Sequence, residues 1–180
     1  SPRTSGWMVS ITDHVLAPVW AEAMAAHGRY VFAPLPWVAS GSRVRLTGDG
    51  PSSWTCWIIV GRPTTGTFRD GTKAAKWGTL PGAYVITQDR NIVVGGKPLD
   101  LMRAIVRDYS RPGDLVVDPC SGGASTLIAA AIEGRRAIGA EMDVDTHAQA
   151  LARIARGYTP VMQMPEVRAV QGGLDLGGGA

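Results

Sequence analysis

The chain has 180 residues, of which 45% are hydrophobic and 18% are charged, a composition typical of a globular domain rather than a disordered one. No apolar run approaches the roughly 18 residues that a membrane-spanning helix needs, and the first residues lack the pattern of a signal peptide. The two cysteines, Cys56 and Cys120, lie far apart, which argues against a disulfide scaffold or a zinc site. We therefore expect a cytoplasmic protein without a bound metal and without a membrane partner.

The net charge of +3 is unevenly distributed. Residues 40–80 carry six basic and two acidic side chains, whereas residues 97–157 carry eight of each sign. A basic segment beside a neutral one suits contact with a polyanion. Since 15 of the 18 basic residues are arginine, a general bias toward arginine gives the same pattern. The expected contacts to a polyanion are Arg43 and Arg45, in a Gly- and Ser-rich stretch.

The first half of the chain alternates short strand-like runs with polar stretches. Strands are predicted at residues 6–12, 30–35 and 54–60, and the last is an unbroken apolar run typical of a strand buried on both faces. The polar residues 39–53 predict a loop. Residues 61–91 show no clear period and predict a long surface excursion.

A helix is predicted after the first strand, where Thr12 or Asp13 can cap it, Pro18 falls in its first turns and Gly28 ends it. A second, amphipathic helix is predicted from apolar residues three and four positions apart, ending before Pro112-Gly113. Those residues are Leu99, Met102, Val106 and Tyr109. The segments that follow are a strand at 115–117, a buried helix at 127–132, a strand at 136–140 and a helix that Asp143 or Asp145 caps and Gly157 ends.

Strands alternating with helices predict an α/β fold, a doubly wound and mainly parallel sheet with helices on both faces. Such sheets bind ligands at the carboxyl ends of their strands. The run from Val116 to Thr126 passes from a strand through a turn of small residues into a helix. Small residues let backbone N–H groups approach a ligand closely.

Glu141 ends the next predicted strand, nineteen residues beyond Gly122, where an acid can bind the ribose of a nucleotide-like ligand. The alternatives are that the turn is an ordinary tight connection and that Glu141 is a helix-capping acid. A G-x-G-x-x-G pattern is absent, and the acid at Asp118 favours a cationic or amine-bearing ligand over a pyrophosphate. S-adenosylmethionine, with its sulfonium and amino groups, fits these requirements.

The stretch GGKPLDLMRAIVRDYSRPGDLVVDPCSGGAST, followed by GRRAIGAEMD, resembles the cofactor half of the DNA N6-adenine/N4-cytosine methyltransferases, with the S-adenosylmethionine-dependent, Rossmann-like fold that this implies. The upstream stretch containing GWMVSITDHVL resembles the catalytic-side half of phage-type members. The resemblance implies double-stranded DNA as partner. It places the methionine part of S-adenosylmethionine on Asp118 and the following turn, the ribose on Glu141, and the methionine end beside Lys97-Pro98. The implied cofactor-binding residues are Lys97, Pro98, Asp118, Pro119, Cys120, Gly122, Gly123 and Glu141.

Two departures from the family pattern fall in the turn itself: Cys120 replaces the usual aromatic residue, and Ala124 stands where a second glycine is expected. The resulting division of the chain is a catalytic-side half, a basic DNA-facing connector, a cofactor half and a flexible tail. Their expected ranges are residues 1–60, 61–91, 92–160 and 161–180.

Methyl transfer to a base amine in this family depends on a D/N/S-P-P-Y/F/W segment, which accepts the amine hydrogens and stacks the flipped base. The 180 residues contain no such segment. The nearest stretch, residues 33–37, ends in Trp37 but lacks the polar acceptor. Asp13 and His14, at a strand end, are further catalytic candidates, with helix capping as the alternative. Related sequences place the segment before GWMVSIT, and the chain starts at Ser1 rather than methionine, so its first half is expected to be incomplete.

The favoured hypothesis is a DNA-binding methyltransferase domain of the restriction–modification or phage kind, acting on adenine N6 in preference to cytosine N4 and inactive without further chain. The alternatives are a non-catalytic remnant that binds S-adenosylmethionine or DNA, and a methyltransferase for RNA, protein or a small molecule.

Overall fold

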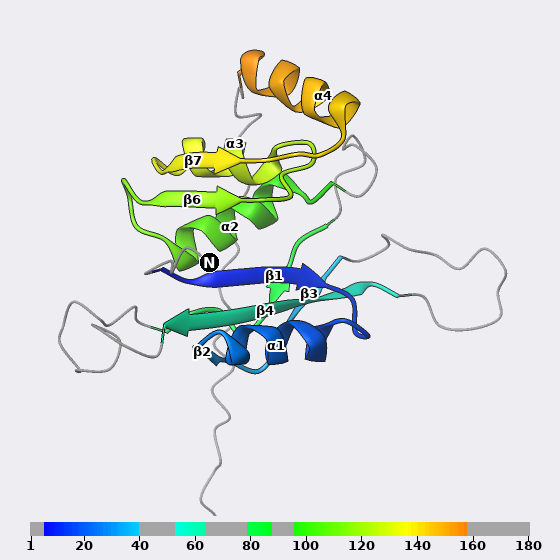
Figure 1. Ribbon diagram of the computed structural model, residues 1–180, viewed down its shortest axis with the longest axis vertical. Coiled ribbons are helices and arrows are strands. Elements are labelled where there is room, and N and C mark those ends of the chain that lie inside the picture. The colour runs from blue at the N-terminus through cyan, green and yellow to red at the C-terminus, as the bar shows by residue number, and fades with distance from the viewer. Residues whose placement is uncertain (1–5, 40–52, 64–78, 88–95, 158–180) are drawn as a thin grey trace, which may run out of the picture.

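The computed structural model describes residues 6–39, 53–63, 79–87 and 96–157. Its strands form two sheets (Figure 1). The larger sheet has five strands, namely β1 (Met8–Thr12), β2 (Arg29–Val31), β3 (Leu35–Val38), β4 (Thr55–Pro63) and β5 (Tyr84–Val85). The smaller sheet pairs β6 (Leu115–Asp118) with β7 (Arg136–Gly139). The helices are α1 (Ala17–Ala26), α2 (Leu99–Tyr109), α3 (Ser125–Ile132) and α4 (Val144–Ala155).

The larger sheet is built around β4, whose apolar run is buried on both faces as its sequence predicts. Ile58 and Val60 face the main core under α2, while Ile59 joins Ala17 and Met24 of α1 on the opposite face. Helices therefore cover both faces of the sheet, which is the doubly wound arrangement. The Rossmann-like α/β class is confirmed.

The strand directions agree with the expected mainly parallel sheet, with one exception. β4 pairs antiparallel with β1, β2 and β3, and β5 pairs parallel with β3, so β4 alone runs against the other described strands of the larger sheet. β6 and β7 also form a parallel pair. β1, β6 and β7 point the same way, and their carboxyl ends lie at one side of the molecule (Figure 1). β1 and β6 each have one paired strand among those described.

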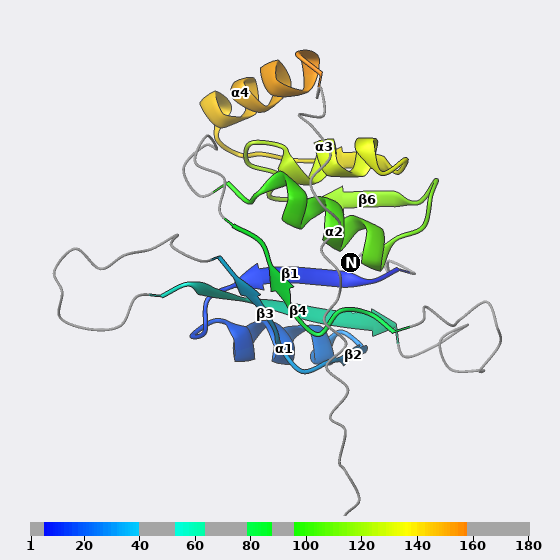
Figure 2. The same ribbon diagram turned by 180° about the vertical axis from the view of Figure 1, so that it is seen from behind.

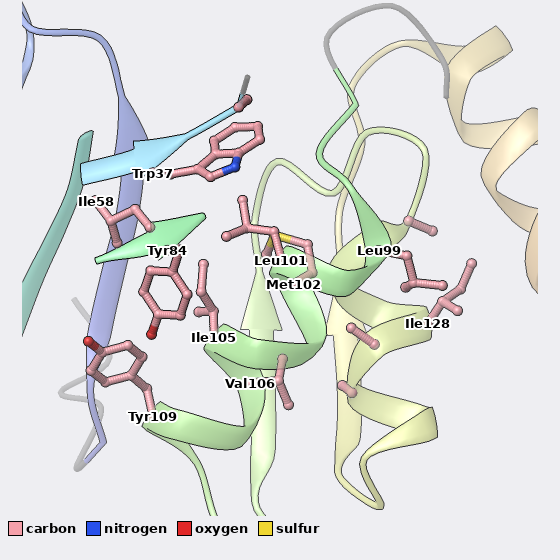
Figure 3. Packing of buried hydrophobic residues seen from close by; sticks show 14 of the residues in the cluster. Trp37, Ile58, Tyr84, Leu99, Leu101, Met102, Ile105, Val106, Tyr109 and Ile128 are labelled. Atoms are coloured by element: carbon pink, nitrogen blue, oxygen red, sulfur yellow. The ribbon is translucent and has the colours of Figure 1, made fainter. Parts of the chain in front are cut away.

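Helix α2 connects the two sheets. Its buried residues Leu101, Met102 and Ile105 face Trp37, Ile58 and Tyr84 of the larger sheet, and Leu99 lies toward Ile128 of α3 (Figure 3). The apolar positions three and four residues apart place one face of the helix in this core, as expected. Each large side chain buried here contributes about 1.5–3 kcal/mol relative to exposure.

Three sequence expectations need correction. The predicted strand at 30–35 is two strands, β2 and β3, separated by exposed Phe32 to Pro34. The expected surface excursion at 61–91 is not all surface, because β4 continues to Pro63 and Tyr84 is buried at 4% exposure. Tyr84 donates a hydrogen bond to Asp108 of α2 at 2.7 Å, and burial, together with this bond, raises its pKa.

The third correction concerns the first helix. It begins at Ala17, and its N-cap, Leu16, has no side-chain capping bond. The Asp13 carboxylate instead accepts from the Val15 and Leu16 amides, both at 2.9 Å, so it stabilises the turn that precedes the helix. Pro18 in the first turn and Gly28, with φ of +73°, agree with the prediction.

The remaining elements lie within two residues of their predicted bounds, and Asp143 caps α4 by accepting from the Thr146 amide at 2.8 Å. Among the described residues, no helix is long and apolar enough to cross a membrane. Most of the expected loop at 39–53, part of the connector and the tail lie outside the described residues, as do Arg43 and Arg45.

A close approach of β7 to the turn after β6 gives the first prediction. A Cβ added at Gly139 would lie 2.9 Å from both Leu127 Cδ1 and Ser121 Cβ, inside van der Waals contact. We expect Gly139→Ala to lower the free energy of unfolding by about 1–3 kcal/mol, measured by urea denaturation.

Gly82→Ala is the matched control, because a Cβ there meets nothing within 4 Å, and it should change stability by less than about 0.5 kcal/mol. Equal stabilities of the two variants would contradict the close packing of β7.

Candidate cofactor site

The turn after β6 is held against the end of β7 by a series of hydrogen bonds. The Ser121 amide and hydroxyl both donate to the Ala140 carbonyl, at 2.9 and 3.1 Å. The Gly122 amide donates to Glu141 Oε2 at 2.8 Å, and the Ala140 amide donates to the Asp118 carbonyl at 3.0 Å. The two strand ends that the sequence singled out, at Asp118 and Glu141, therefore form one structural unit.

The backbone of the turn explains its small residues. Gly122 has φ of +49° and Ala124 has φ of +65°, both in the left-handed region. Ala124 is the position where the family pattern has glycine, and its conformation costs a non-glycine residue about 1–2 kcal/mol. Ala124 is fully buried, with 0% exposure, which leaves no room for a larger side chain. The turn thus keeps the glycine-like backbone although alanine stands at position 124.

Two carboxylates lie at the open side of this turn. Asp118 Oδ1 accepts from the Cys120 amide at 3.0 Å. Glu141 Oε1 accepts from the Asp143 amide at 3.0 Å, in addition to its bond with Gly122. These bonds from the Asp143 and Gly122 amides hold the pKa of Glu141 below its usual range. A lowered pKa favours the ionised carboxylate in the folded chain, so this contribution is present at neutral pH and is lost as the pH falls through the lowered pKa.

Lys97 and Pro98 directly precede α2, and Pro98 is buried at its N-cap position. α2 runs antiparallel to β6, so its start lies at the side of the molecule where β6 ends (Figures 1 and 2). Cys120 is exposed. All eight residues expected to bind the cofactor thus fall on the carboxyl side of β6 and β7 or at the start of α2.

Of the three catalytic candidates, Asp13 and His14 follow β1, whose carboxyl end lies on the same side of the molecule as those of β6 and β7, and Trp37 lies in β3. Trp37 is only 3% exposed, and its indole N–H donates to the Ile86 carbonyl at 2.8 Å, which favours a packing role over base stacking. Asp13 serves the turn before α1. His14 is exposed at the rim of an open, mostly apolar cavity of about 430 Å³. The other lining residues are Ala17, Pro18, Ala21, Pro34 and Trp57. Trp54, which its apolar run predicts to be in the core, is 43% exposed.

Two site residues have no counterpart in the sequence-based prediction. Ser121 lies within the quoted motif, but its bonds to Ala140 depend on the register between β6 and β7. Arg153 of α4 donates from Nη1 to the Gly123 carbonyl at 2.7 Å and to Ser125 Oγ at 3.1 Å. The sequence does not predict such a contact, because a single arginine on a helix surface forms no recognisable pattern.

Comparison with solved structures identifies the class of fold. The described fold resembles the M1.HpyAVI–SAM complex, with a TM-score of 0.69, 20% identity, and coverage of 83% of this chain and 74% of that chain. It also resembles TTHA0409, a putative DNA modification methylase from Thermus thermophilus solved with S-adenosyl-L-methionine, with a TM-score of 0.63 and 24% identity over 84% of this chain and 70% of that chain. The fold is that of the S-adenosylmethionine-dependent methyltransferases.

Sequence comparison finds a similarity to DNA methylases over part of the chain. Residues 85–152 match the model of the family described as DNA methylase, N6_N4_Mtase. A curated relative, Type II methyltransferase M.EcaI from Enterobacter cloacae, is 29% identical over 109 residues, which are 58% of this chain. Over these residues the chain is similar to the DNA N6-adenine/N4-cytosine methyltransferases. The match spans 24%, about a quarter, of the relative's length.

Proposed function

We propose that this chain binds S-adenosylmethionine at the carboxyl ends of β6 and β7, as the cofactor half of a DNA amino-methyltransferase. The observation that carries the proposal is the attachment of the turn at 118–124 to Glu141 through the Gly122 amide. This bond places an ionised carboxylate beside a turn of small residues, a combination suited to a ribose and a positively charged amino acid group. The family match over residues 85–152 supports the same ligand, as do the M1.HpyAVI–SAM complex and the complex of TTHA0409 with S-adenosyl-L-methionine, which are similar in fold.

The donors and acceptors present fit this cofactor. Each Glu141 oxygen accepts one backbone N–H, and a carboxylate oxygen has a second lone pair with which it can accept a ribose hydroxyl. Asp118 and the turn would hold the methionine portion, with Lys97-Pro98 at its end. The bound cofactor would supply a methyl group activated by its sulfonium. The chain's own residues orient it, and no bond to the methyl group is required of them.

Replacing Glu141 tests the assignment of the ribose. Glu141→Ala removes a charged acceptor and should weaken S-adenosylmethionine binding by about 1.5–3 kcal/mol, roughly 10- to 150-fold, in isothermal titration calorimetry. Glu22→Ala, an exposed glutamate on α1, is the control and should bind as the parent does. An affinity unchanged by Glu141→Ala would rule out this residue as the ribose partner.

We further propose DNA as the partner of the basic segment. The connector and the segment before β4 carry the local excess of positive charge, and the family model that residues 85–152 match is described as DNA methylase. In this arrangement residues 1–60 form the target-side half, residues 61–91 the connector and residues 92–160 the cofactor half, with 161–180 as a tail. Adenine N6 remains the favoured acceptor over cytosine N4.

Charge neutralisation tests the DNA contact. Arg43→Gln with Arg45→Gln should weaken duplex binding and flatten the slope of log K against log salt by up to about two units, since each phosphate contact contributes about 0.9. The control changes Arg136 and Arg156 to Gln, which removes the same charge from the cofactor half. If the control flattens the slope and the first variant leaves it intact, the DNA site lies on the cofactor half instead.

A final element of the proposal is that the 180 residues bind cofactor without transferring its methyl group. A base amine is a poor nucleophile because its lone pair is delocalised into the ring, and preorganised acceptors for its hydrogens each contribute about 10²–10³ in rate. The sequence holds no D/N/S-P-P-Y/F/W segment to supply them.

A tritiated-methyl transfer assay on mixed-sequence duplex DNA should therefore give no incorporation above background with the 180-residue chain. Robust transfer would contradict the proposal and direct attention to Asp13 and His14. Cofactor and DNA binding without transfer by any longer form of the protein would favour the non-catalytic remnant.

A further inference from the structure

Helix α4 is attached to the rest of the fold in an unusual way. Of its twelve residues, all within the described part of the chain, Ala150 alone is buried. Apolar side chains that would anchor an ordinary amphipathic helix are exposed, namely Val144 at 78%, Leu151 at 54% and Ile154 at 43%. Apolar burial therefore contributes little to its position. Polar contacts must hold it.

Those contacts reach the turn of the proposed cofactor site from two sides. Glu141, two residues before the N-cap Asp143, accepts the Gly122 N–H at 2.8 Å. Arg153, near the other end of α4, donates to the Gly123 carbonyl at 2.7 Å and to Ser125 Oγ at 3.1 Å. The chain segment 141–153 thus holds adjacent residues of one turn, by an acceptor at one end and a donor at the other.

The hydrogen bonds of Arg153 fix the orientation of the peptide between Gly123 and Ala124. The carbonyl of Gly123 and the amide of Ala124 belong to one planar peptide and point in opposite directions. Arg153 holds the oxygen, and the Ser121 carbonyl accepts the Ala124 N–H at 2.8 Å. Both sides of the plane are therefore held, next to an alanine in the left-handed conformation that glycine adopts more readily. Without Arg153, the strain at Ala124 favours a rearranged turn.

We infer that Arg153 is a positioning residue for the cofactor turn, and that docking of α4 and binding of the cofactor are coupled through it. The inference rests on the proposed cofactor site. A ligand that binds the turn in this conformation stabilises the bonds to Arg153, and by reciprocity a docked α4 raises the affinity of the turn for the ligand. α4 stabilises the turn through the hydrogen bond from Arg153 to the Gly123 carbonyl.

The test compares three variants on the same helix. Arg153→Met keeps the aliphatic stem and removes the donors, and Arg153→Lys retains a charge and a donor. Arg156→Met is the control, since Arg156, the C-cap of α4, donates from Nε to the Ala152 carbonyl of the same helix and to no residue of the turn among those described. S-adenosylmethionine affinity is measured by calorimetry, and amide hydrogen exchange of residues 122–125 and of α4 is followed with and without ligand.

We expect Arg153→Met to weaken binding by about tenfold or more, Arg153→Lys to recover part of the loss, and Arg156→Met to match the parent. Without ligand, amide hydrogen exchange in both α4 and the turn should be faster in Arg153→Met than in the parent. Adding S-adenosylmethionine to the parent should slow exchange in α4. A merely structural role would give no recovery by lysine and no ligand-dependent protection of α4.

Parent-like affinity and parent-like exchange in Arg153→Met would overturn the inference. If the parent itself does not bind S-adenosylmethionine, the proposed function fails, but the exchange experiment on the free protein still decides whether Arg153 holds α4 to the turn. If Arg153→Met does not fold, Arg153→Lys answers the same question, because it keeps the charge.

Discussion

The packing of α2 against both sheets is the constraint on which the rest of the described structure depends. The two sheets share no strand pairing among the described residues, so their relative position is set by the side chains of α2 that face Trp37, Ile58 and Tyr84 on one side and α3 on the other. The hydrogen bond from Tyr84 to Asp108 adds a polar link between the connector and this helix. By fixing α2, the core also fixes where Lys97 and Pro98 stand relative to the end of β6.

Once α2 is in place, local pairing between β6 and β7 sets the geometry of the candidate site. α2 leads through a tight connection into β6, β6 pairs in parallel register with β7, and the register brings Ser121 to Ala140 and Gly122 to Glu141. Gly139 permits this approach because it has no Cβ to meet Leu127 and Ser121. The candidate cofactor site is thus a property of the two-stranded sheet and its turn, whereas the strands that pair with β4 belong to a separate sheet.

Sequence patterns predicted the cofactor half better than the first half. The motifs at Asp118 and Glu141 lie between strongly periodic helices, and short connections leave few alternative topologies. The sequence predicts a single strand at 30–35 because the apolar residues continue through exposed Ala33 and Pro34. In the structure these two residues lie between β2 and β3. The antiparallel pairing of β4 and the burial of Tyr84 depend on contacts between distant segments, which local patterning does not contain. The same holds for Arg153, whose partners lie about thirty residues away.

We propose the turn after β6, hydrogen-bonded to Glu141, as the place where the cofactor binds. An ¹H–¹⁵N NMR titration with S-adenosylhomocysteine, which lacks the reactive methyl group, tests this directly at each amide. We expect the largest chemical-shift changes at the amides of Cys120, Gly122, Gly123 and Asp143, and no change at the Trp57 indole. Shifts centred on Trp57 and His14, beside the cavity at the end of β1, with the turn unperturbed, would contradict it.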